Sequence, residues 1–73
     1  MLPVADFLGQ LSEDEHRDLV NAVGAGLHDA RLAAQCLTDP GQRHSGHVAQ
    51  LLAYLSGAIR QLEEAREMVR RRA

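Results

Sequence analysis

Residues 48–69 read VAQLLAYLSGAIRQLEEAREMV, and this stretch decides the fold class. Its apolar residues recur at steps of three and four, the spacing that places side chains on one face of an α-helix. Leu52, Ile59 and the stem of Arg66 lie beside the main series, so the apolar face is wider than a contact between two helices requires. The main series consists of Val48, Leu51, Leu55, Ala58, Leu62, Ala65 and Val69.

A second long helix is predicted over residues 13–37. Ser12 followed by Glu15 matches a capping box, in which each side chain bonds the backbone N–H of the other residue. Gly24 and Gly26 each weaken the helix by about 1 kcal/mol relative to Ala, but the apolar pattern stays in phase on both sides of them. The pattern is a heptad series that we expect to form the seam of this helix. It comprises His16, Val20, Val23, Leu27, Ala30, Ala34 and Leu37.

The two long helices are predicted to form an antiparallel hairpin. Pro40 ends the first helix, so we expect a turn over residues 38–45 and the next helix over residues 46–71. The alternative is a helical restart capped by Asp39 instead of Ser45. A short helix over residues 3–9, with Pro3 in its first turn, is predicted to lay Phe7 and Leu8 onto the hairpin.

Charge and side-chain size support the hairpin. The acidic start of the first long helix, with Glu13, Asp14 and Asp18, meets the arginines at 70–72, and both suit their helix dipoles. Pairs at Arg60–Glu64 and Glu67–Arg71 have the i,i+4 spacing. Small residues allow close helix approach, so a strip on the first long helix is a candidate contact with the second. That strip contains Gly26, Ala30, Ala33 and Ala34.

The chain is too short to cover these helices by itself. Its 73 residues form one domain at most, and a chain of this size buries only about 60% of the surface that its unfolded form exposes. Cys36 is the only cysteine, which excludes an internal disulfide, and Phe7 and Tyr54 are the only aromatic residues. We therefore predict an all-α protein whose hairpin dimerises into a four-helix bundle.

Composition indicates a cytoplasmic protein. The net charge is −2 and the pI is about 6.0, which disfavours nucleic acid and anionic membranes as partners. The N-terminus lacks the basic region of a signal peptide, and the longest charge-free run, residues 45–59, is too short and polar to span a bilayer. All eight basic residues are Arg, which with abundant Ala and Leu suggests a GC-rich bacterial or phage gene.

Candidate metal ligands gather near the predicted turn. Cys36, His44 and His47 suit zinc, with Asp39 or water as a fourth ligand. The spacing matches no established metal motif, so an incidental role is favoured and no cofactor is expected. His16 and His28 are more isolated and are expected to be exposed or half-buried.

Catalytic and nucleic-acid patterns are weak. Ser12 and Ser45 are explained as helix caps, Ser56 has no patterned base, and residues 24–26 lack the strand and third glycine of a phosphate loop. The arginines at 70–72 could touch phosphate, but no aromatic residues are interleaved with them. We therefore expect a protein that is not an enzyme.

The leading functional prediction is a small protein–protein interaction module, acting as an adaptor, assembly factor or inhibitor. It would associate with itself and with an unidentified protein partner through its surplus apolar surface. The alternatives are a metal-binding bundle that uses Cys36, His44 and His47, and a nucleic-acid-binding regulator that uses the C-terminal arginines. The predicted interface residues are the apolar anchors Val48, Leu51, Leu52, Leu55, Ile59 and Leu62, with Arg60 and Glu64 as a charged rim.

Overall fold

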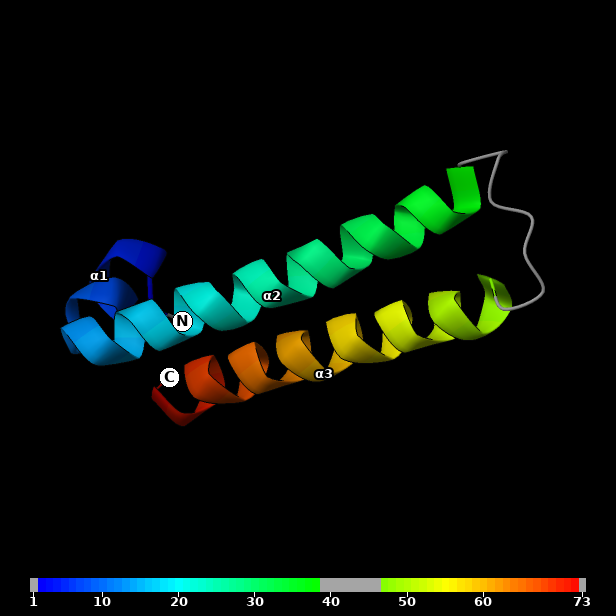
Figure 1. Ribbon diagram of the computed structural model, residues 1–73. Coiled ribbons are helices and arrows are strands. Elements are labelled where there is room, and N and C mark those ends of the chain that lie inside the picture. The colour runs from blue at the N-terminus through cyan, green and yellow to red at the C-terminus, as the bar shows by residue number, and fades with distance from the viewer. Residues whose placement is uncertain (1, 39–46, 73) are drawn as a thin grey trace.

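The computed structural model describes residues 2–38 and 47–72, and three α-helices account for most of them (Figure 1). They are α1 (Val4–Gly9), α2 (Glu13–Thr38) and α3 (His47–Arg72). The long helices α2 and α3 lie antiparallel and pack against each other, while α1 lies at the end where α2 begins and α3 ends. The all-α class and the hairpin are thereby confirmed, and the described residues contain no strand. The predicted turn lies outside the described residues, except for Thr38, which ends α2.

The predicted capping box is present at the start of α2. The backbone N–H of Ser12 donates to Glu15 Oε1 at 3.1 Å, and the backbone N–H of Glu15 donates to Ser12 Oγ at 3.1 Å. Two of the N–H groups that the first turn leaves without a helical partner are satisfied in this way. The helix then runs without interruption through Gly24 and Gly26.

The contact between α2 and α3 is made mainly by small residues. On α2 the buried positions are Ala22, Gly26 and Ala33, and on α3 they are Ala58 and Ala65. A Cβ atom added to Gly26 would lie 2.7 Å from Leu62 Cγ and 3.4 Å from the backbone oxygen of Ala58. Such proximity is possible only because the position has no side chain. The two backbones therefore approach closely in the middle of the hairpin.

The predicted seam of α2 is wrong by one residue. Leu27 is 49% exposed and Leu37 is 71% exposed, and Val20 and Val23 are exposed as well. The series that faces α3 begins one position earlier, which turns it by about 100° around the helix. It contains the buried and half-buried residues Glu15, Leu19, Ala22, Gly26, Asp29, Ala33 and Cys36.

The predicted seam of α3 is correct only in part. Ala58 and Ala65 are buried and Leu51 is half-buried, but the other four members of the series are exposed: Val48, Leu55, Leu62 and Val69. The small strip on α2 is divided in the same way, because Gly26 and Ala33 are buried whereas Ala34 is exposed. On α2 the side that faces α3 thus has smaller side chains than the predicted seam, whereas on α3 this side also contains the half-buried Leu51, Tyr54 and Met68.

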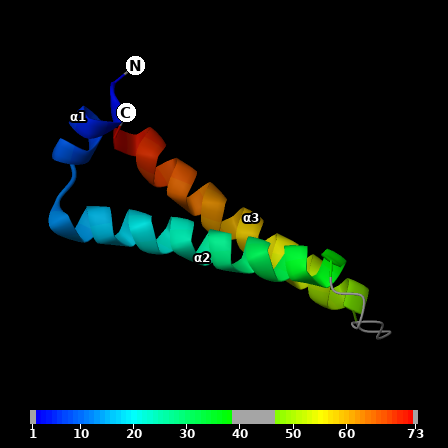
Figure 2. The ribbon, with the colours of Figure 1, turned by 90° about the horizontal axis from the view of Figure 1, so that it is seen from above.

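The molecule is an open rod. Its extents are 47 × 23 × 16 Å and its radius of gyration is 15.7 Å, against about 11 Å for a compact chain of this length. Among the described residues, no large side chain is fully buried. Seen from above, α2 and α3 diverge toward the end that carries α1 (Figure 2). Phe7, the one buried residue of α1, lies at this end. No helix in the described ranges is both long and apolar enough to cross a bilayer.

Candidate interaction surface

Each long helix carries a second apolar series that the hairpin leaves uncovered. On both helices its members come one residue after positions that face the other helix, and they repeat at steps of four and three, with Arg66 in the position between Leu62 and Val69. We call the two series together the open face. It consists of Val20, Val23, Leu27, Ala30, Ala34 and Leu37 on α2, and of Val48, Leu52, Leu55, Ile59, Leu62 and Val69 on α3.

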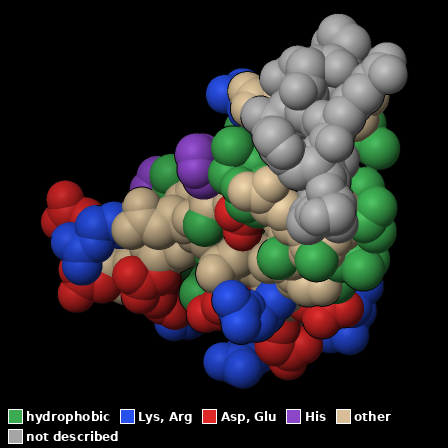
Figure 3. All heavy atoms as spheres, turned by 45° about the vertical axis from the view of Figure 1, so that its right-hand side comes forward, with side chains coloured by type: hydrophobic (Ala, Val, Ile, Leu, Met, Phe, Trp, Pro, Cys, Tyr) green, Lys and Arg blue, Asp and Glu red, His purple; other side chains and the backbone are tan. Residues whose placement is uncertain are grey.

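Both series lie on the same side of the hairpin. A step of one residue turns the direction of a side chain by about 100° around the helix axis. Because α2 and α3 run in opposite directions, a step of one residue turns clockwise on one helix and anticlockwise on the other when both are viewed from the same end. The two series start from positions that face each other, so these opposite rotations bring both series to the same side of the hairpin. The proximity of Leu62, a member of the α3 series, to Gly26 of α2 agrees with this placement. Figure 3 shows hydrophobic side chains gathered in a column along one side of the molecule.

The structure separates the predicted interface residues into two groups. Leu52 is 58% exposed and Ile59 is 56% exposed, and Val48, Leu55 and Leu62 are exposed beside them. Leu51 is half-buried and belongs to the side of α3 that faces α2. It is therefore part of the hairpin contact and not of the open face.

Arg60 and Glu64, the predicted rim residues, are exposed. Within the described part of the chain they do not form the predicted ion pair with each other, whereas Arg71 Nε lies 3.5 Å from Glu67 Oε1 as predicted. The α2 half of the open face was missing from the predicted site. Its signal was present in the sequence as the series Val20–Leu37, but that series was assigned to the contact between the helices.

The open face is electrically neutral over most of its length. Its α2 series contains no charged residue from Val20 to Leu37, and its α3 series contains none from Val48 to Leu62. The first charged residue in phase with the α3 series is Arg66, toward the α1 end. A partner that covers this part would therefore bury mainly apolar side chains, with Glu63 and Arg66 as the charged residues beside Ile59 and Leu62.

At the α1 end an ion pair joins the two long helices. Arg72 donates from Nε to Glu15 Oε2 at 2.8 Å, and its Nη2 atom contacts the same oxygen. The predicted meeting of the acidic and arginine-rich ends is thus confirmed, although the carboxylate is Glu15 and not Glu13, Asp14 or Asp18. Asp14 instead accepts from Arg17 at 2.9 Å.

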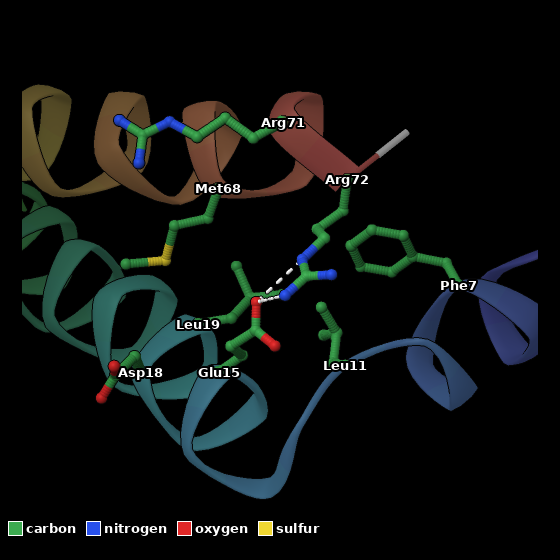
Figure 4. A pocket seen from close by; sticks show the side chains of 8 residues that line it. All are labelled: Phe7, Leu11, Glu15, Asp18, Leu19, Met68, Arg71 and Arg72. Atoms are coloured by element: carbon green, nitrogen blue, oxygen red, sulfur yellow. Dashed lines mark hydrogen bonds and ion pairs between the residues drawn. The ribbon is translucent and has the colours of Figure 1, made fainter.

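A pocket of about 220 Å³ lies beside this ion pair. In Figure 4 the Phe7 ring lies next to the guanidinium of Arg72, with Leu11, Leu19 and Met68 around them. The pocket is the place where α1 meets the diverging ends of α2 and α3. Arg72 thus connects the ends of α2 and α3, whereas Arg71 pairs with Glu67 within α3.

The ion pair is expected to make stability depend on pH. The backbone N–H of Ser12 and the guanidinium of Arg72 both favour the charged form of Glu15 and hold its pKa below the ordinary value of 4.5. A carboxyl group with a lowered pKa stabilises the folded state above its unfolded-state pKa, and this contribution is lost as the pH falls through the folded-state value.

Glu15→Gln is accordingly expected to be less stable than the wild type at neutral pH, and the difference should disappear well below pH 4.5. Urea unfolding followed by circular dichroism across this range measures it. Glu13→Gln is the control, because no hydrogen bond or ion pair is seen at Glu13. If the difference in unfolding free energy between the wild type and Glu15→Gln stayed constant across the pH range, Glu15 would not stabilise the fold through its charge.

Of the candidate metal ligands, the described residues include Cys36 and His47. Cys36 is half-buried on the side of α2 that faces α3, and His47 is the first residue of α3. His44 and Asp39 lie outside the described residues. Within residues 2–38 and 47–72 no group of three His, Cys, Asp or Glu side chains is placed to hold a metal ion.

Comparison with protein-family models, with curated proteins and with solved structures finds no match to this chain.

Proposed function

We propose that the chain is a non-enzymatic helical interaction module that binds protein through its open face. The observation that carries this proposal is the distribution of side-chain size. The exposed large apolar residues of α2 and α3 lie on the open face, while the buried positions between the two helices are Ala and Gly.

The extent of the apolar surface supports the proposal. Soluble monomers rarely expose a contiguous apolar patch of more than a few hundred Å². Here ten of the exposed large residues belong to two series that share one side of the hairpin, together with the small residues Ala30 and Ala34. A surface of this kind is typical of an interface that is covered by another protein in use.

The roles of the residues follow from their positions. Leu52, Ile59 and Leu27 project from the middle of the open face and are its anchors, because residues at the centre of an interface are fully shielded from water and carry most of the binding energy. Arg60 and Glu64 are exposed on α3, with Glu64 beside Asp18 and Ala22 of α2, and charged residues outside the centre of an interface contribute selectivity more than affinity. The module acts as an adaptor, assembly factor or inhibitor.

Replacing Leu52 and Ile59 together by Glu tests the proposal. Each Glu places a charge where an interface would be dry, so we expect the sedimentation mass to fall and the helix content to fall with it. The control is Ala49→Glu with Ala53→Glu, two exposed positions away from the centre of the open face, which changes the net charge by the same amount. An unchanged mass and an unchanged circular dichroism spectrum for Leu52→Glu/Ile59→Glu would contradict the proposal.

A further inference from the structure

We infer that the open face is covered by a second copy of this chain, so that two hairpins form a four-helix bundle with the α2 and α3 series as its core. This inference rests on the proposed function and names the partner of the same surface. It also adds α2 to the interface, with Val20, Val23, Leu27 and Leu37 as contact residues.

The chain exposes more surface than a compact monomer of its mass. The chain has an accessible surface of 5638 Å², whereas a folded monomer of 8.0 kDa is expected to have about 4,450 Å². The surplus of about 1,200 Å² exceeds the roughly 800 Å² that each partner contributes to a standard stable interface. One copy therefore exposes enough additional surface to supply its half of a stable dimer.

The shape of the open face matches a second hairpin. It is two helices wide, and the α2 and α3 series follow the four-and-three spacing that interdigitates in coiled-coil-like bundles. A single partner helix would cover the centre of this face but leave its outer edges in water. A second hairpin presents two helices of the same length with the same spacing, so it covers both series at once.

The charge distribution of the open face is a further argument. Two identical charged surfaces repel each other when they meet, which disfavours self-association. The open face avoids this cost, because neither series contains a charged residue between Val20 and Leu37 or between Val48 and Leu62. The face is thus compatible with its own copy.

The contact between α2 and α3 within one chain is weak, and this affects how the chain folds. Ala and Gly bury little apolar area, and burial provides about 25 cal/mol per Å². The buried Ala and Gly positions between α2 and α3 thus stabilise a single hairpin little, and the large residues of the open face become buried only when two copies meet. Folding and association are consequently coupled.

Sedimentation equilibrium of the full chain at micromolar to millimolar concentration tests the inference. The wild type is expected to have twice the 8.0 kDa mass of one chain. Leu27→Glu is the decisive variant, because Leu27 belongs to α2 and lies outside the contact with α3. Its dimer dissociation constant should rise at least about a hundredfold, since a buried anchor is lost twice in a symmetric dimer. Gln35→Glu adds the same charge on the outer side of α2 and should leave the constant unchanged.

The remaining outcomes separate this inference from the proposed function. A wild type that is a poorly helical monomer at every concentration would overturn the inference of a dimer. The proposal that the open face binds a different protein would then remain. A stable helical monomer that also tolerates Leu52→Glu/Ile59→Glu would overturn both. An assembly of three or more copies, or a Leu27→Glu variant that remains dimeric, would overturn the two-hairpin bundle while the binding role of the face remained.

Discussion

Gly26→Leu is expected to destabilise the protein by about 1–3 kcal/mol or more, the cost of overpacking a close contact. The Cβ atom alone would lie 2.7 Å from Leu62 Cγ and 2.8 Å from Leu62 Cδ2. Leu62 is exposed and can rotate away from a Cβ, but the Ala58 backbone oxygen, 3.4 Å away, cannot. We expect the added branches of a leucine to crowd this oxygen and to push α2 and α3 apart.

Gly24→Ala is the matched control, because it changes a glycine of the same helix two residues away. A Cβ at Gly24 meets nothing within 4 Å, so only the gain in helix propensity remains, about 1 kcal/mol of stabilisation. For a chain of this size, 1 kcal/mol corresponds to about 4–8 °C in the unfolding midpoint. We expect the two variants to shift the midpoint in opposite directions when circular dichroism is followed with temperature. A Gly26→Leu variant as stable as Gly24→Ala would show that the backbones do not approach closely there.

The unfolding midpoint of the wild type is expected to rise with protein concentration. When two folded chains separate on unfolding, each tenfold increase in concentration adds about 1.4 kcal/mol to the stability of the dimer. For two chains of 73 residues, about 2–4 °C corresponds to 1 kcal/mol, so the shift should be roughly 3–6 °C per tenfold. Across a hundredfold range the effect should therefore exceed that of most single substitutions.

Thermal unfolding at several concentrations, in cells of different path length, provides the measurement. The Gln35→Glu variant should show the same dependence as the wild type. Leu27→Glu should show a low midpoint that does not change with concentration in the micromolar range, because its chains no longer associate. A wild-type midpoint independent of concentration would mean that one hairpin is stable with its leucines exposed.

The sequence by itself determined the helices and their direction. Ser12 and Glu15 fix the start of α2, because their side chains satisfy N–H groups that no helical carbonyl can reach. The four-and-three spacing of apolar residues requires helices on both sides of Pro40, and matched lengths require them to run antiparallel. The opposite charges at positions 15 and 72 then meet at one end. These features depend on local geometry and on sequence spacing, which can be read without coordinates.

Only the tertiary structure decided which side of each helix faces the other. Two series with the same spacing run along α2, one residue apart, and hydrophobicity favours the larger residues of Val20–Leu37 as the contact. The structure instead places the series of Ala22, Gly26 and Ala33 against α3, where small side chains let the two backbones approach each other closely. Periodicity identifies both series but carries no information on the distance between helices. For that reason the sequence alone could not show that the large residues of α2 are left on the surface.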